Sequence, residues 1–289
     1  MPNLSDAFAA ALSADTPVGF QLSSGLDWLM PPWNMAEVGA LMTTRNGGVS
    51  RVPFDSMNLR LEVGDIPASV LQNRARLKHL TNATSIYLKQ EHGNRVVRLM
   101  ADDLDPGLPP IIADACVTSE PGIACTVMVA DCLPVLFAAP QGRAVGAAHA
   151  GWRGLAQGVL EQTLAGVCQV ADCEPHEVQT WLGPCIGPTA FEVGADVLQA
   201  FGFDPQAFGA SAEITGRYFT PLDSKLTSSE EGPKWLGNLP MLAYDLLTAA
   251  GARQIKGGTW CTVHDAEKFF SYRRDCGISG RMAALVWIR

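Results

Sequence analysis

Basic residues are in short supply in this sequence of 289 residues, which has 21 Lys and Arg against 29 Asp and Glu and a formal net charge of −8. Nucleic acids and anionic membrane surfaces attract proteins that carry a surplus of Lys and Arg, so we expect neither as a partner. The longest hydrophobic run, residues 132–139, contains Pro134 and is far shorter than the roughly 20 residues that span a bilayer. The N-terminus has no basic start of the kind that opens a secretory signal, so we expect a cytoplasmic protein.

Motifs of several common enzyme classes are missing as well. Neither GxxxxGK[ST] nor GxGxxG occurs, so nothing supports binding of a nucleoside triphosphate or a dinucleotide. The absence of GxSxG argues against a serine hydrolase of the α/β-hydrolase type. The eight cysteines include no CxxC pair, which excludes a zinc ribbon. In a chain of this size without a secretory signal, we expect these cysteines to be free thiols.

The sequence does contain enough apolar side chain for a large core, since 47% of its residues are hydrophobic and 17% are charged. We interpret residues 1–36 as an N-terminal lead-in and residues 37–289 as one domain, because no linker or repeat divides the chain. Hydrophobic periodicity predicts helices at 67–82, 154–170, 195–201 and 239–250, strands within 37–61 and 86–99, further strands at 111–118, 123–130, 133–139, 144–148, 179–182 and 281–288, and a surface excursion at 202–237. Strands cluster centrally and helices are interspersed without strict alternation, which favours an α+β fold with mixed sheets.

Two histidines and one cysteine stand at predicted strand ends. His92 and His149 lie beside small residues, which let a backbone or a ligand approach closely. Cys132 lies between two apolar strands, where a buried cysteine is usually just a small hydrophobic residue. The separations of 40 and 17 residues along the chain form no recognised motif. If the three side chains converge, they supply two nitrogens and one sulfur and leave a fourth position for water or substrate, as catalytic zinc sites do.

Arginines in loops rich in glycine or serine give a second signal. Arg45, Arg153 and Arg273 each lie in such a loop. Any one of them is most commonly a solvated surface charge, but a guanidinium group is also suited to fork-like recognition of phosphate. In an acidic protein these arginines are therefore candidates for binding a phosphate group.

Seven segments follow one another in a recognisable order: TTRNGGVS (43–50), QEHG (90–93), ADA (113–115), ADCLPV (130–135), HAGWRG (149–154), GPCIGP with FEVG (183–194) and FFSYRRD (269–275). Together they resemble the bacterial polyphenol oxidase/laccase-domain family, whose members are regarded as purine nucleoside phosphorylases with some adenosine deaminase activity and have been linked to peptidoglycan editing. The resemblance runs from about residue 37 to the C-terminus, and ADCLPV and HAGWRG are its most diagnostic segments.

This resemblance implies an α/β/β/α layered sandwich and one zinc ion bound by His92, Cys132 and His149. It also implies a purine nucleoside and phosphate as substrates. Adenosine or inosine, with methylthioadenosine as a further candidate, would be cleaved by phosphate to the free base and the ribose 1-phosphate. The site must then hold a phosphate dianion near the sugar, and the candidates for binding substrate and phosphate are Arg45, Asn58, Arg153 and Arg273.

Adenosine deamination would in addition need a carboxylate that shuttles protons. Glu91, Asp114 and Asp131 are the candidates. Strand alternation would turn Asp131 away from Cys132 unless a bulge intervenes.

Three other functions stay open at the level of sequence. Five histidines are too few for a laccase-type set of several coppers, but a single copper at the His92–Cys132–His149 trio could support polyphenol oxidase activity. Cys132 could instead be the nucleophile of a metal-free hydrolase, with a histidine as base, acting on peptidoglycan precursors. A binding module without catalysis is the third alternative. The sequence does not predict the oligomeric state.

Overall fold

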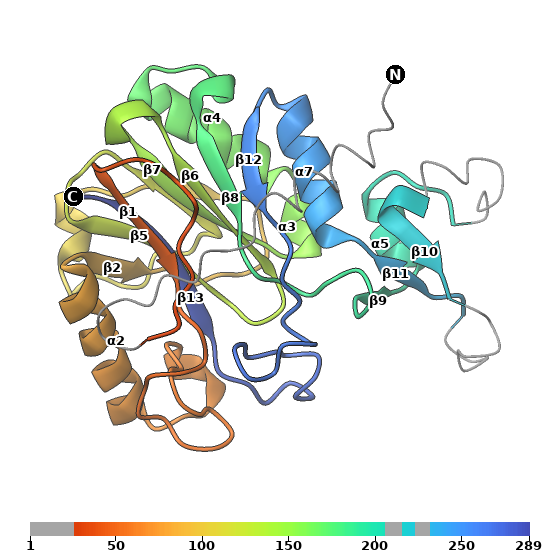
Figure 1. Ribbon diagram of the computed structural model, residues 1–289, viewed down its shortest axis with the longest axis horizontal. Coiled ribbons are helices and arrows are strands. Elements are labelled where there is room, and N and C mark those ends of the chain that lie inside the picture. The colour runs from red at the N-terminus through yellow and green to blue at the C-terminus, as the bar shows by residue number, and fades with distance from the viewer. Residues whose placement is uncertain (1–25, 206–215, 223–231) are drawn as a thin grey trace.

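Two mixed β-sheets lie face to face, with helices on the outer side of each (Figure 1). The computed structural model describes residues 26–205, 216–222 and 232–289. Helix α2 (Pro67–Thr81) covers one sheet, while α4 (Val159–Ala171) and α7 (Leu239–Ala249) cover the other. This arrangement confirms the predicted layered fold with mixed sheets.

The smaller of the two stacked sheets has four strands in the order β1 (Val38–Met42), β13 (Met282–Ile288), β5 (Ile123–Val129) and β2 (Thr84–Tyr87). The larger has six strands in the order β12 (Gln254–Gly257), β8 (Gln179–Leu182), β6 (Leu133–Ala138), β7 (Val145–Ala150), β4 (Ala115–Thr118) and β3 (Val96–Arg98). Both sheets are mixed, because the outer pairs β2–β5, β12–β8 and β3–β4 run parallel and the other pairs are antiparallel. The chain therefore crosses between the sheets several times, so segments distant in sequence meet at their edges.

A third, small sheet lies to one side of these layers together with a short helix (Figure 1). Its antiparallel strands are β9 (Glu192–Val193), β11 (Trp235–Gly237) and β10 (Phe219–Pro221), and the helix is α5 (Ala195–Ala200). Short 3₁₀ turns occur at Leu61–Val63, Ala101–Leu104, Pro140–Gly142 and Pro175–Glu177.

The central strands are hydrophobic on both faces because each sheet is covered on both sides. In β5, Cys125 and Val127 pack between the two sheets, whereas Ala124 and Met128 face outward to the layer of α2. Since successive side chains in a strand point to opposite faces, both faces of β5 must be apolar. This requirement explains the hydrophobic segment at 123–130, in which Thr126 is the one polar residue.

The segment predicted as one helix at 154–170 forms two helices, α3 (Trp152–Ala156) and α4. The prediction of a single continuous helix was therefore wrong. The interruption lies at Gly158, whose φ of 86° is left-handed and incompatible with a continuous helix. Periodicity missed the break because the apolar face continues across it.

The described part of the lead-in is packed rather than loose. Trp28 is fully buried, and Leu29 exchanges backbone hydrogen bonds of 2.9 and 2.8 Å with Met42 on β1. Residues 1–25 lie outside the described residues, as do 206–215 and 223–231 of the predicted surface excursion. The boundary between residues 36 and 37 stays a prediction.

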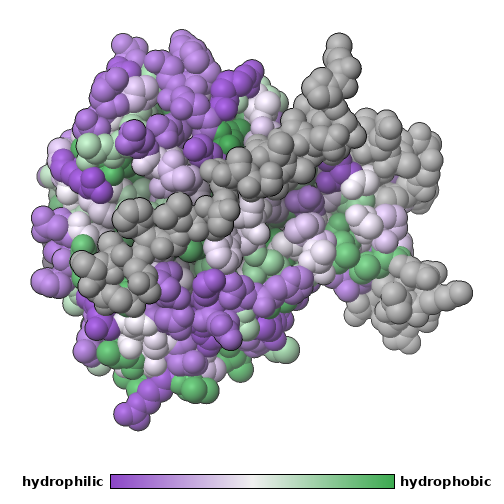
Figure 2. All heavy atoms as spheres, in the orientation of Figure 1, coloured by the Kyte–Doolittle hydropathy of each residue, from purple (hydrophilic) through white to green (hydrophobic). Residues whose placement is uncertain are grey.

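Hydrophilic residues predominate on the face drawn in Figure 2, and the hydrophobic residues coloured there form small separate patches. None of the helices among the described residues is long and apolar enough to span a bilayer. All eight cysteines are described and are free thiols.

Candidate metal centre

The hairpin of β6 and β7 sets Cys132 beside His149. Pro134 pairs with His149 and Leu133 with Ala150, so Cys132, one residue before β6, lies next to the end of β7. His92 reaches the same point from the segment that follows β2. One ligand atom from each of these three residues lies within 4.8 Å of the others. Cys132 Sγ is 3.7 Å from His92 Nε2, and the two imidazole rings meet edge to face at 4.8 Å between centroids.

Asp114 holds both histidines in place. It directly precedes β4, whose pairing with β7 sets it opposite His149, and its Oδ1 accepts a hydrogen bond from His149 Nδ1 at 2.8 Å. The same carboxylate accepts the backbone N–H groups of Glu91, His92 and Gly93 at 3.1, 2.9 and 2.8 Å. His92 has a left-handed φ of 61°, which these bonds stabilise. A carboxylate on Nδ1 fixes the tautomer and leaves Nε2 free to bind a metal.

Burial and neighbouring charges have opposite effects on the pKa values of the Cys132 thiol and the buried His149 imidazole. Burial alone would raise the pKa of Cys132, but His149 and His92 outweigh it and lower the pKa to about 6. Burial would likewise lower the pKa of His149, but Cys132 and Asp114 raise it to about 9. The pair is thus poised as thiolate and imidazolium, and a metal ion would replace the imidazolium proton.

Gly151 makes the close approach of these groups feasible. A Cβ atom at this position would lie 2.8 Å from His92 Cδ2 and 3.2 Å from Cys132 Sγ. Any other residue would press against His92 and Cys132, which explains the glycine that follows His149-Ala150 in the sequence. Two nitrogens and one sulfur, mutually close and oriented by a carboxylate, are a donor set that suits Zn²⁺.

A cleft of about 490 Å³ opens over the trio. This volume is within the range of pockets that bind small molecules. Its walls divide by chemistry: an apolar wall of Ile186, Phe191 and Leu239, two aromatic residues, Trp152 and Tyr272, and four arginines, Arg60, Arg153, Arg273 and Arg281. The cleft can therefore hold a flat apolar group and an anion at the same time.

Two of the predicted substrate-binding residues line this cleft. Arg153 is exposed, with its guanidinium carbon 4.3 Å from the centroid of the Trp152 ring. Arg273 is also exposed, and its Nη1 donates to the carbonyl of Glu192 at 3.0 Å.

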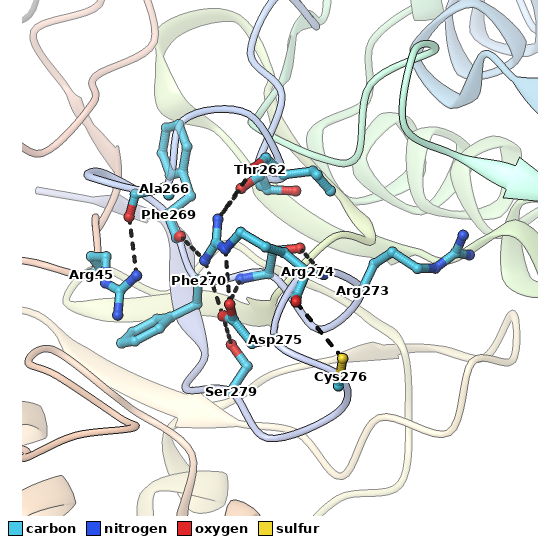
Figure 3. Close-up of polar contacts among 12 residues, drawn as sticks. Arg45, Thr262, Ala266, Phe269, Phe270, Arg273, Arg274, Asp275, Cys276 and Ser279 are labelled. Carbon is cyan, nitrogen blue, oxygen red and sulfur yellow. Dashed lines mark hydrogen bonds and ion pairs between the residues drawn. The ribbon is translucent and has the colours of Figure 1, made fainter.

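Arg45 and Asn58 are not among the described residues of the cleft wall. Arg45 Nε donates to the carbonyl of Asp55 and Nη1 to that of Ala266, each at 3.0 Å, and the guanidinium stacks on Phe270 (Figure 3). Asn58 is fully buried. A contact of either side chain with substrate stays a prediction.

Figure 3 also shows that the side chains of Arg273 and Arg274, which are adjacent in the C-terminal motif, lie in different surroundings. The Arg274 side chain is enclosed by the carbonyls of Thr262 and Phe269 and by the Asp275 carboxylate, which it binds at 2.8–3.0 Å. The Arg273 side chain points away from this cluster. Arg274 thus fastens the loop, and Arg273 remains available to the cleft.

The three carboxylates considered for proton transfer are engaged elsewhere. Asp131 accepts hydrogen bonds from Thr262 Oγ1 at 2.6 Å, Ser271 Oγ at 3.0 Å and the backbone N–H of Arg273 at 2.7 Å. It lies between strands with a φ of 93°, so alternation within a strand does not apply to it. Glu91 is exposed and forms an ion pair of 3.0 Å with Lys89. Asp114 serves the two histidines, as described above.

With this geometry established, the chain can be compared with known proteins. Residues 39–289 match the profile of the family described as multi-copper polyphenol oxidoreductase laccase. The chain belongs to this family. The resemblance found in the sequence is thereby confirmed.

Relatives within this laccase-like family are named as purine nucleoside phosphorylases. One from Pseudomonas aeruginosa is 43% identical over 91% of this chain and 98% of its own length. YfiH from Escherichia coli is 42% identical over 90% of this chain and 98% of its own.

Solved structures of the family share the fold. A Neisseria meningitidis protein of family DUF152 matches with a TM-score of 0.78 and 42% identity over 90% of this chain and 98% of its own. YlmD from Geobacillus stearothermophilus matches with a TM-score of 0.78 and 30% identity over 94% and 99%.

Sequence reasoning missed Arg60 and Arg281, two of the four arginines in the cleft wall. Arg60 lies two residues after Asn58, which was predicted to bind substrate, and this proximity could have drawn attention to Arg60. Arg281 stands just before β13 and becomes part of the site only through the pairing of distant strands, so no local pattern marks it.

Proposed function

We propose that the protein is a zinc-dependent purine nucleoside phosphorylase that cleaves adenosine or inosine, and methylthioadenosine as a further substrate, with adenosine deaminase as a side activity. The observation that carries the proposal is the position of the His92–Cys132–His149 trio at the base of a cleft that also has arginines and an apolar wall. The names of relatives at 42–43% identity support the same reaction. A phosphorylase must bind a heterocycle, a sugar and a dianion together, and the apolar wall and the arginines offer partners for the first and the last of these.

In the proposed reaction, a phosphate oxygen forms a bond to C1′ of the ribose and the bond from C1′ to the purine nitrogen breaks. The electron pair of that bond goes to the purine, which takes up a proton. Ile186, Phe191 and Leu239 would pack against the purine, and Arg153 and Arg273 would contact the substrates from the open side of the cleft. Held by the trio, zinc would supply a Lewis acid at the base of the cleft.

We expect deamination to be the minor activity, because none of the three candidate carboxylates is free of other partners. A deaminase needs a carboxylate free to move protons. Asp131, Asp114 and Glu91 are each committed to other partners. We therefore expect inosine formation from adenosine to be slower than phosphorolysis.

The test combines metal analysis with product analysis. Purified protein should contain about one zinc per chain, and adenosine and inosine should release free base only when phosphate is present. Cys132→Ser should remove both the metal and the activity, whereas Cys173→Ser, the same change at a thiol outside the cleft, should leave both unchanged. Base release at equal rates without phosphate would identify a hydrolase. Copper in place of zinc, together with oxidation of phenols, would favour the oxidase alternative.

A further inference from the structure

Two arginines from distant parts of the chain are brought together at one wall of the cleft. The buried amide oxygen of Asn58 accepts the backbone N–H of Arg60 at 3.1 Å and that of Arg281 at 2.9 Å. Leu59 N–H donates to the carbonyl of Arg281 at 3.1 Å. These bonds fix two backbones separated by more than 200 residues, so both arginines line the cleft from one rigid base.

The two positive charges are poorly compensated. Arg60 Nε is 3.4 Å from Glu62, whose side chain is 69% exposed, so that contact is weak. Arg281 Nη1 donates to the carbonyls of Ser279 and Gly280 at 2.7 and 3.0 Å. Burial, and then the charge of Arg60, lower the pKa of Arg281, and the opposing charges of Cys132, Tyr272 and Asp131 offset this only in part. Two partly buried like charges with so little neutralisation are a place where an anion of two negative charges binds favourably.

The other two arginines of the cleft are less suited to that task. Arg153 and Arg273 are exposed, whereas Arg60 and Arg281 are partly buried, so water screens the first two charges more strongly. Asp131, which also lines the cleft, has its carboxylate turned to three donors, and its charge offsets only part of the effect of burial on Arg281. The Arg60–Arg281 pair is therefore the more desolvated cationic surface, where charge-assisted hydrogen bonds are stronger.

We propose that Arg60 and Arg281 form an oxyanion subsite that takes the phosphate dianion, at the wall of the cleft beside the metal centre. The identity of the anion as a reactant rests on the proposed function, but its binding does not. A guanidinium pair can offer several N–H donors to the oxygens of one phosphate. In this proposal Arg60 and Arg281 bind the attacking phosphate, and other residues of the cleft bind the nucleoside.

The experiment measures binding of inorganic phosphate to the zinc-loaded protein by titration calorimetry, alongside steady-state kinetics. Arg60→Met and Arg281→Met should each weaken phosphate binding by about 10- to 100-fold, as expected for loss of a charge-assisted pair. The KM for phosphate should rise in parallel, while the KM for inosine should stay within about twofold. Arg98→Met, the same change on strand β3 outside the cleft, should alter nothing.

Conservative variants keep the test decisive if a methionine variant is poorly folded. Arg60→Lys and Arg281→Lys retain the charge but lose the planar fork, so phosphate affinity should fall between that of the wild type and that of the Met variants. Melting temperature and zinc content should match the wild type in every variant that is compared.

Three outcomes separate the subsite from the proposed function. Wild-type protein that binds no phosphate, or folded variants that bind it with unchanged affinity, would overturn the subsite. Phosphate binding that the Arg60 and Arg281 variants abolish, in a protein that cleaves no nucleoside, would support the subsite and refute the phosphorylase. Loss of phosphate affinity with a matching rise in the KM for phosphate would support both.

Discussion

At the scale of single residues, Asp114 positions two of the three residues of the trio. One carboxylate receives a ring nitrogen of His149 and three consecutive backbone N–H groups of the segment that contains His92. It therefore fixes two of the three candidate ligands without being one itself. Such outer-shell carboxylates set the orientation and basicity of the histidines they contact.

We predict that Asp114→Asn lowers zinc affinity by about 10- to 100-fold, because an amide orients His149 less firmly and lacks the negative charge. Competition with a chromophoric chelator would measure the change. Asp245→Asn, which removes a carboxylate bound to Arg217 outside the cleft, is the matched control and should leave zinc affinity as it is. Equal affinities in Asp114→Asn and wild type would show that the carboxylate only shapes the backbone.

Asp275 provides a second prediction at this scale, on acid stability. Burial would raise its pKa, but the Arg274 guanidinium, the Ser271 N–H and the Ser279 hydroxyl together lower it below the ordinary value of 3.8. A carboxylate with a lowered folded-state pKa contributes stability above its unfolded pKa and loses it as the pH falls through the folded one.

We therefore expect Asp275→Asn to destabilise the protein by about 1–2 kcal/mol at pH 7 and by less near pH 3. Urea unfolding of variant and wild type at both pH values would measure this difference. A destabilisation of the same size at both pH values would mean that geometry, and not the charge of Asp275, holds the loop.

At the scale of elements, the bend between α3 and α4 shows what a hydrophobic pattern conveys and what it omits. The pattern located the apolar face of the segment correctly, because Leu155, Leu160 and Leu164 all pack into one core cluster. It did not reveal the break, which depends on the backbone conformation of Gly158 alone. Element positions were thus predictable wherever periodicity and end signals agreed, as at α2, which begins at Pro67.

We predict that Gly158→Ala destabilises the protein by about 1–2 kcal/mol, the cost of a left-handed conformation for a residue with a Cβ. Steric clash adds nothing here, since the nearest atoms to that Cβ would be side-chain atoms at 3.8 and 3.9 Å. Chemical denaturation would measure the free energy of unfolding.

Gly166→Ala in the interior of α4 is the matched control for that change. Its Cβ would meet Val117 at an ordinary 3.5 Å, so helix propensity should stabilise the protein by up to about 1 kcal/mol. A Gly158→Ala protein as stable as the wild type would show that the junction readily adopts another conformation.

At the scale of the whole molecule, sequence reasoning found the residues that lie in distinctive segments and missed those that only the topology brings to the cleft. His92, Cys132 and His149 were found from their motifs, and the structure brings them together. Arg281 could not be found in this way, because its place in the cleft depends on contacts with distant residues such as Asn58, 223 residues earlier. Arg45 was singled out as a phosphate ligand, which stays a prediction; in the structure its guanidinium donates to the carbonyls of Asp55 and Ala266.

The trio joins segments that are far apart in the sequence. His92 lies in the connection between β2 and β3, Cys132 in the connection between β5 and β6, and His149 on β7. An ion bound by all three would therefore hold these segments together and favour the folded chain over the unfolded one. The stabilisation follows from mass action and amounts to about 2.7 kcal/mol when free zinc is 100 times its dissociation constant.

We accordingly predict that removing the metal with a strong chelator lowers the melting temperature by about 5–10 °C, the shift that such a free energy produces in a protein of this size. Adding back zinc should restore the original value. Differential scanning calorimetry of Cys132→Ser should show a small response to chelator or zinc, because one of the three ligands is gone. A full shift in that variant would place the stabilising ion elsewhere in the molecule and would remove the physical basis for a metal at the base of the cleft.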